Sequence, residues 1–100
     1  MEFEWDEDKR LQVLAERGID LIRAARIFRG EVLTKVDARA GYGEVREVSV
    51  GLVDEECYVV VHTLRDGIVR LVTAWKGGRR VKAEYQEGIA RRNRGDAQAR

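Results

Sequence analysis

Apolar positions in the first thirty residues recur at helical spacing and are interrupted by glycines. The pattern predicts a short strand over residues 2–5, a helix over about 6–17 and a second helix over about 20–29. Asp6 and Asp20 are suitable N-caps because their carboxylates can accept from free backbone N–H groups. Gly18 and Gly30 follow as helix stops. Two helices therefore precede any long strand.

After this region the hydrophobic period changes to that of strands rich in valine. We expect three strands over about residues 44–52, 56–64 and 68–75, and a less marked one over 32–37. Asp66-Gly67 is a strong signal for a two-residue hairpin, since a type I′ turn needs positive φ at both positions. Asp54-Glu55 is a weaker signal of the same kind.

The last quarter of the chain predicts one more helix. Gly77-Gly78 breaks the strand pattern, and a helix is expected over about residues 79–92. Its docking face is predicted to carry three residues at a spacing of four, namely Val81, Tyr85 and Ile89. We expect residues 1–92 to form a single domain and residues 93–100 to be a basic, disordered tail.

Helices followed by antiparallel strands indicate an α+β protein. The prediction is two N-terminal helices packed on a twisted four-stranded antiparallel sheet, with a C-terminal helix. A half-covered sheet of this type leaves its other face or one rim open to a ligand.

Composition narrows the functional classes. The chain has 100 residues, 44% of them hydrophobic and 37% charged, which suits one small core. No apolar run is long enough to span a membrane, and the acidic start does not resemble a secretory signal, so we expect a cytoplasmic protein. Cys57 is the single cysteine, which excludes an internal disulfide framework.

Charge is distributed unevenly along the chain. From Lys76 onward there are eight basic and three acidic residues, while the net charge of the whole chain is only +1. A basic C-terminal quarter suggests a polyanion surface or an acidic partner, although solvated helix charges give the same pattern.

Strand pairing brings a group of polar side chains to one end of one sheet face. If Asp66-Gly67 and Asp54-Glu55 are both turns, that face carries a run of valines including Val72. It ends in five polar residues, Glu44, Arg46, Thr63, Arg65 and Arg70. Guanidinium forks bind phosphate oxygens and keep their charge, so the cluster predicts a phosphate site. A rim of cross-strand ion pairs is the alternative, and a one-residue slip of the weaker hairpin at Asp54-Glu55 would disperse the cluster.

The remaining polar and aromatic residues give weaker evidence for a functional site. His62 is the only histidine, which gives no support to a histidine metal site or a Ser-His-Asp triad. On the same registers it lies on the opposite face, beside Leu71, and we expect a core or surface histidine. Trp5 and Trp75 are expected to pack in the core rather than to stack on bases.

Residues spread over positions 3–86 resemble the BrnT family in their order and spacing. The resemblance is carried by Phe3-Glu4-Trp5-Asp6, Lys9, Gly18, Ile27-Phe28, Asp37, Tyr42-Gly43-Glu44-Val45-Arg46, Gly51, Val59-Val60-Val61, Thr63, Arg65, Arg70, Thr73-Ala74-Trp75-Lys76, Arg79-Arg80 and Tyr85. It implies a RelE-like fold and a metal-independent endoribonuclease toxin of a type II toxin–antitoxin pair, which inhibits translation. It also implies a BrnA-like antitoxin, DNA contact only through that antitoxin, and no cofactor.

Carried onto this chain, the resemblance implies site residues in two groups. The first is Glu44, Arg46, Arg65 and Arg70, and the second, near the last helix, is Lys76, Arg79, Arg80 and Tyr85. Four positions depart from the family pattern: Val13, Glu16 and Arg17 stand where Asn, Lys and His are usual, and Val81 where an acidic residue often follows the basic pair. A catalytic histidine in relatives would make this chain slow or inactive, whereas at a helix end Arg17 is a harmless replacement.

The mechanism we expect is attack by the RNA's own 2′-hydroxyl on the adjacent phosphorus. Glu44 would be the base, and Arg46, Arg65 and Arg70 would stabilise the developing charge. Tyr85 or Lys76 would be the acid, and Lys76, Arg79 and Arg80 would contact RNA. The rival hypothesis is a non-catalytic module that binds RNA or a partner through the basic last helix.

Overall fold

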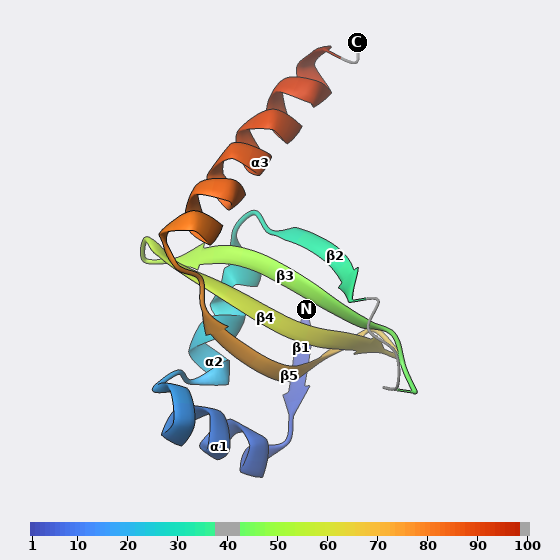
Figure 1. Ribbon diagram of the computed structural model, residues 1–100. Coiled ribbons are helices and arrows are strands. Elements are labelled where there is room, and N and C mark those ends of the chain that lie inside the picture. Colours follow the sequence, from blue (N-terminus) through green and yellow to red (C-terminus); the bar gives the residue numbers. More distant parts are fainter. Residues whose placement is uncertain (38–42, 99–100) are drawn as a thin grey trace.

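Five strands form one twisted, mixed sheet in the order β1-β5-β4-β3-β2 (Figure 1). In this computed structural model the described residues are 1–37 and 43–98. The strands are β1 (Glu2–Trp5), β2 (Leu33–Asp37), β3 (Arg46–Val53), β4 (Glu56–Arg65) and β5 (Ile68–Lys76). The helices are α1 (Glu7–Arg17), α2 (Leu21–Ala24), the 3₁₀ helix η1 (Ala25–Arg29) and α3 (Arg79–Gln98).

The α+β class is confirmed, but the prediction of four antiparallel strands is wrong. β1 is a fifth strand that pairs with β5 in parallel, from Glu2 opposite Ile68 to Trp5 opposite Leu71. Parallel neighbours need a long connection between them, and here most of the chain separates the two strands. Short-range patterns could not reveal this pairing, because β1 fills the open edge of β5 from a distant part of the sequence.

The second predicted helix is also different in detail. It is α-helical only over Leu21–Ala24 and then tightens into η1. With three residues per turn, a 3₁₀ helix aligns residues three apart, and Ala24 and Ile27 are both completely buried. Ile27 sits directly on Gly51 of β3, where an added Cβ would lie 2.8 Å from the Ile27 Cβ atom. The glycine thus lets η1 approach the sheet closely.

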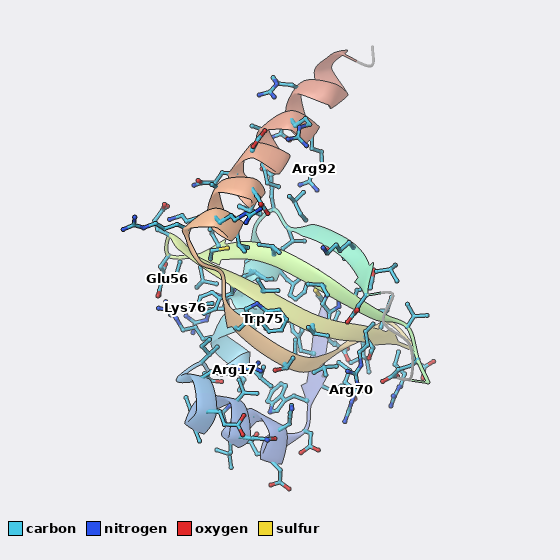
Figure 2. The ribbon with its side chains drawn as sticks, in the orientation of Figure 1. Arg17, Glu56, Arg70, Trp75, Lys76 and Arg92 are labelled. Carbon is cyan, nitrogen blue, oxygen red and sulfur yellow. The ribbon has the colours of Figure 1, made fainter. Side chains whose placement is uncertain are left out.

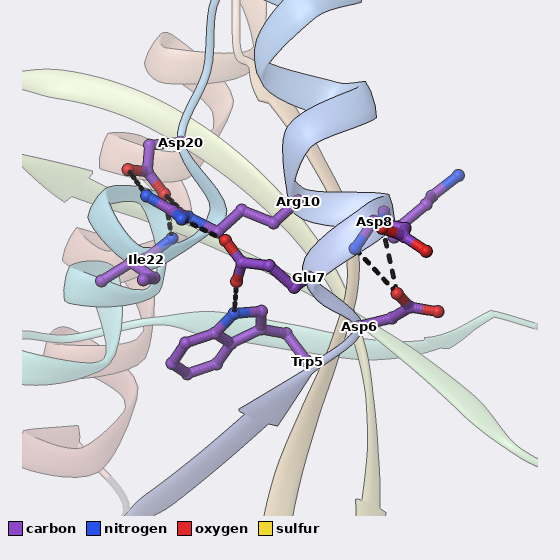
Figure 3. A network of polar contacts seen from close by, with 8 residues as sticks. Trp5, Asp6, Glu7, Asp8, Arg10, Asp20 and Ile22 are labelled. Carbon is purple, nitrogen blue, oxygen red and sulfur yellow. Dashed lines mark hydrogen bonds and ion pairs between the residues drawn. The ribbon is translucent and has the colours of Figure 1, made fainter.

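Both predicted N-caps are confirmed, and a polar network connects the second one to α1 (Figure 3). Asp6 accepts from the backbone of Asp8, and Asp20 accepts from the backbone of Ile22, at 2.9 Å each. Arg10 in α1 donates two hydrogen bonds of 2.9 Å to the Asp20 carboxylate. This guanidinium lowers the pKa of Asp20. The network therefore fixes the start of α2 against α1.

Both predicted hairpins have the expected registers. Asp54, Glu55, Asp66 and Gly67 all have positive φ, as two-residue turns of this kind require. Val53 lies opposite Glu56, and Arg65 lies opposite Ile68. One detail was missed: the β4–β5 register skips Val72, since Val61 faces Thr73 and His62 faces Leu71. This bulge interrupts the alternation on which the placement of Val72 depended.

The core lies between the sheet and the N-terminal helices. Central strand β4 is buried without a break from Cys57 to Thr63. On the helix side, Val60, Leu71 and Ala74 pack in one cluster with residues of α1, α2 and η1. No helix within residues 1–37 and 43–98 is long and apolar enough to cross a membrane.

Helix α3 docks near the start of β2 through the predicted face. The Tyr85 hydroxyl donates to the Glu31 carbonyl at 2.6 Å, and Arg92 donates to the Val32 carbonyl at 3.0 Å. Gly88 approaches Leu33 so closely that a Cβ there would lie 2.6 Å from a Leu33 methyl carbon. The helix continues to Gln98, beyond the predicted end at residue 92, and its C-terminal part projects from the body of the molecule (Figure 1).

His62 is a core residue, as predicted. It is 5% exposed, and its Nε2 atom is 2.7 Å from the Ser49 hydroxyl, which in turn is 2.6 Å from the Thr34 hydroxyl. The Phe28 ring meets the imidazole edge-on at 5.1 Å between centroids. Burial lowers the pKa of His62, against a smaller opposite effect from Glu47.

Acidification should therefore weaken the fold through His62. Its folded pKa lies below the unfolded value near 6.5, so the neutral ring's contribution is present above pH 6.5 and is lost as the pH falls below it. The free energy of unfolding should decrease by up to about 1.4 kcal/mol per pH unit in this window. Urea unfolding of the parent and of His62→Gln between pH 7.5 and 5 measures this. Equal pH slopes for the two proteins would contradict the prediction.

Candidate functional site

The predicted polar cluster assembles where β3, β4 and β5 begin or end. Arg65, at the end of β4, donates to a Glu44 carboxylate oxygen at 3.1 Å. Glu44 precedes β3, and the two residues sit in the extension of the confirmed β3–β4 register. Their side chains are 55% and 37% exposed, so a ligand can reach both groups.

Arg70 is part of the same end of the sheet and has a carboxylate partner that the sequence did not reveal. Its guanidinium is 3.4 Å from a Glu4 carboxylate oxygen (Arg70 is labelled in Figure 2). Glu4 lies directly opposite Arg70 in the parallel β1–β5 pair. Glu44 is therefore not the only carboxylate beside these arginines. The missing signal was the parallel pairing of β1, which no local pattern shows.

Thr63 occupies the middle of the cluster and is the most unusual of its members. Thr63 of β4 lies opposite Arg70 of β5. On its other side, the β3–β4 register, extended by one residue, places Arg46 of β3 opposite Thr63. Its side chain is 2% exposed, and its Oγ1 atom has no hydrogen-bond partner among the residues that the structure describes. Buried hydroxyls are nearly always hydrogen-bonded, so an unsatisfied one in register with two arginines is an unusual feature of the cluster. Arg46 itself is half-buried and lies opposite Asp37 of β2.

The second predicted group lies at the other end of β5. Lys76 is six positions from Arg70 along the strand, a separation of roughly 20 Å (Figure 2). It forms an ion pair of 2.7 Å with Glu56, which also contacts Arg23 at 3.3 Å. The Glu56 carboxylate raises the pKa of Lys76. Lys76 is thus occupied within the protein and is not beside the cluster.

The first turns of α3 carry the rest of this group. Arg79 and Arg80 are exposed, and Arg80 pairs with Glu84 on its own helix at 3.2 Å. Tyr85 is 8% exposed, and its hydroxyl is engaged by the Glu31 carbonyl. Burial is the main cause that raises the pKa of Tyr85. The structure therefore does not bring Tyr85 or Lys76 to the cluster of Glu44, Arg65 and Arg70.

The comparison with known families decides the identity. The model of the ribonuclease toxin BrnT of type II toxin–antitoxin systems matches residues 5–80. This chain belongs to the BrnT family. Membership implies an RNA substrate and an antitoxin partner. No curated protein sequence matches the chain. Tyr85 and Glu4 lie outside the matched residues.

The positions that depart from the usual BrnT pattern have structural roles here. Val13 is a core residue with 2% exposure, and Glu16 is exposed and accepts from Gln12 at 3.1 Å. Arg17, at the end of α1, donates to the Thr73 hydroxyl at 2.9 Å and to the Ala74 carbonyl at 3.1 Å. These contacts favour the interpretation of position 17 as a helix-end residue.

Trp75 lies beside this helix end rather than in the core. It is 37% exposed, and the Arg17 guanidinium lies 5.7 Å from the centre of its ring (Figure 2). The expectation that Trp75 packs in the core is therefore wrong, because the ring stays partly open to solvent and lies beside a cation. Trp5, in contrast, is half-buried against the core as expected.

The cluster of this BrnT-family chain has the chemistry of an anion site. Guanidiniums of Arg65 and Arg70 face solvent, and each holds a carboxylate that a phosphate could displace. Among the described residues there is no group of three or more His, Cys, Asp or Glu side chains placed to hold a metal ion. The residues present are suited to bind and polarise a phosphodiester.

A structural role for Tyr85 gives a direct test. Tyr85→Phe removes the hydrogen bond to Glu31 and should lower the free energy of unfolding by about 1 kcal/mol. Urea unfolding measures this loss, and circular dichroism checks that the fold is retained. Unchanged stability together with lost RNA cleavage would instead assign the hydroxyl to the reaction.

Proposed function

We propose that this BrnT-family protein is a metal-independent endoribonuclease that cleaves RNA at the sheet-end cluster of Glu44, Arg46, Arg65 and Arg70. Cleavage would inhibit translation, and a BrnA-like antitoxin would neutralise the enzyme in the cytoplasm. Any contact with DNA would be made by the antitoxin. Family membership supports the ribonuclease class, and the cluster supports the location of the chemistry.

The observation that carries this location is the buried Thr63 hydroxyl. It lies in register between Arg46 and Arg70 and has no acceptor or donor among the described residues. A non-bridging phosphate oxygen placed there would accept from the hydroxyl and from the flanking guanidiniums. Such a preorganised set of donors binds best when negative charge on the phosphate increases, as it does in the transition state.

The first step proposed is attack of the RNA 2′-oxygen on phosphorus. The Glu44 carboxylate accepts the 2′-hydroxyl proton as the new P–O bond forms. Its ion pair with Arg65 holds it in place. General bases of this kind typically contribute about 10²–10⁴-fold to a rate.

The second step is departure of the 5′-oxygen, which breaks the old P–O bond. The products are a 2′,3′-cyclic phosphate and a 5′-hydroxyl end. Arg70 would donate a hydrogen bond to the leaving oxygen, which takes its proton from water. Arg70 and water thus take the role that the sequence analysis gave to Tyr85 or Lys76 as the acid, because both of these residues lie at the other end of β5.

The composition of the cluster supports cleavage without a metal. Its carboxylates, Glu44 and Glu4, are already paired with guanidiniums, and the neighbouring positive charges disfavour a divalent cation. The guanidiniums can supply the charge stabilisation for which other nucleases use a metal ion. Arg79 and Arg80 at the start of α3 would contact RNA outside the cluster.

Cleavage of a labelled RNA in the presence of EDTA tests the proposal. The parent should cleave, and Arg70→Ala should be at least about 10²-fold slower, which is the usual effect of removing one transition-state donor. Arg91→Ala is the matched control, since it removes a guanidinium that pairs only with Glu87 on α3. An Arg70→Ala variant that cleaves at the parent rate would rule out this site.

Thr63→Val separates the functional role of the hydroxyl from any structural one. Valine has nearly the same shape and relieves the unsatisfied buried oxygen, so the free energy of unfolding should stay the same or rise by about 1 kcal/mol. RNA cleavage should nevertheless fall by about tenfold or more, by loss of one neutral hydrogen bond to the phosphate. Urea unfolding and a cleavage time course measure the two effects. Full activity in a stable Thr63→Val protein would show that no phosphate oxygen occupies this position.

A further inference from the structure

A cavity lies on the helix-covered side of the sheet, between β1 and η1. Its volume is about 420 Å³, and it is lined by Phe3, Phe28, Arg26 and Arg29 together with aliphatic side chains. No acidic side chain lines it. The cavity thus combines aromatic surface with two positive charges.

The aromatic part of this cavity is held in place from behind. The rings of Phe3 and Phe28 are 5.7 Å apart between centroids, and Phe28 rests edge-on against the buried ring of His62. Both phenylalanines are only half-buried, so part of each ring remains open to the cavity. A flat ligand could stack there without displacing any core side chain.

The basic part consists of two exposed guanidiniums, of which Arg26 acts only electrostatically on the Asp20 carboxylate. Arg26 and Arg29 make no hydrogen bond or ion pair with any other residue in the described part of the chain, and both are exposed. Their neighbours in sequence and space, Arg10 and Arg23, are both engaged by carboxylates. Two free guanidiniums at the mouth of a cavity suit an anionic group.

We propose that this cavity is a subsite for one nucleotide of a single-stranded RNA, with its base on the Phe28 and Phe3 rings and its phosphate on Arg26 and Arg29. Base stacking on aromatic side chains beside basic residues is the general way in which proteins hold single strands. An acidic peptide would satisfy the arginines but would leave the ring faces without a planar partner. This inference rests on the proposed ribonuclease function and names a second RNA contact for it.

The position of the cavity relative to the cluster is suitable. Phe3 and Glu4 are adjacent on β1, and side chains of adjacent strand residues point to opposite faces. Phe3 packs toward the core and the cavity, whereas Glu4 pairs with Arg70 of the cluster. The two sites are therefore separated by the edge strand alone, and an RNA passing around β1 would reach both.

Binding of an uncleavable RNA tests this subsite without relying on catalysis. The probe is a fully 2′-O-methylated single strand of about ten nucleotides, within the span of known single-strand sites, measured by fluorescence anisotropy. An Arg26→Gln, Arg29→Gln double variant should bind it about tenfold more weakly at low salt. Phe28→Leu, which keeps the apolar volume, should weaken binding by about fivefold.

A matched control removes the same charge elsewhere. The Arg91→Gln, Arg94→Gln double variant alters exposed positions on α3 and should bind nearly as the parent does. If it loses as much affinity as the Arg26 and Arg29 variant, the effect is general electrostatics and the subsite is overturned. Unchanged binding by the Arg26 and Arg29 variant would also overturn it.

Cleavage separates this inference from the proposed function. A dinucleotide substrate is too short to reach the cavity, so the Arg26 and Arg29 variant should cleave it at the parent rate. The same variant should cleave a longer RNA less efficiently than the parent when the RNA concentration is low. If the parent cleaves no RNA but the variant still binds the methylated probe more weakly than the control does, the subsite stands and the catalytic proposal fails.

Discussion

Burial of β4 on both of its faces is the constraint on which the rest of the structure depends. Seven successive residues, from Cys57 to Thr63, are buried, so this strand must lie in the middle of the sheet with material on either side. The valines supply apolar surface for both faces, whereas His62 and Thr63 are the polar exceptions. His62 has a partner for Nε2 in the Ser49 hydroxyl and packs against the edge of Phe28, while its Nδ1 atom has no hydrogen-bond partner among the described residues. Thr63 is left unsatisfied within the described structure. The two neighbours differ in their surroundings, because His62 packs among core side chains whereas Thr63 lies at the end of the strand where the charged cluster begins.

The candidate site follows from where that burial stops. Beyond Thr63 the strand emerges into solvent at Leu64 and Arg65, and its neighbours present Glu44 and Arg70 at the same level. A site at this boundary has a rigid, dry floor and charged, accessible walls. Those are the conditions in which hydrogen-bond donors act strongly on a developing charge, because they need not reorganise during the reaction.

Local signals in the sequence predicted the helices, hairpins and registers, because caps and two-residue turns depend on nearby residues. Val53 opposite Glu56 and Arg65 opposite Ile68 follow directly from the turn residues. What could not be predicted depends on contacts between distant segments. The parallel pairing of β1, which brings Glu4 to Arg70, is one case, and the seating of Ile27 on Gly51 is another. Tyr85 and Lys76 were grouped with the arginines only through family resemblance, and the length of β5 separates them.

The ion pairs of the cluster are compatible with binding RNA because they are weak. The side chains of both ion pairs, Arg65 with Glu44 and Arg70 with Glu4, are at least one-third exposed. Exposed pairs of this kind contribute only about 0–1 kcal/mol to the free energy of unfolding. A phosphate, which offers more acceptor oxygens than a carboxylate, would displace one at small cost. Until then the carboxylates keep the guanidiniums in nearly the geometry that the phosphate needs.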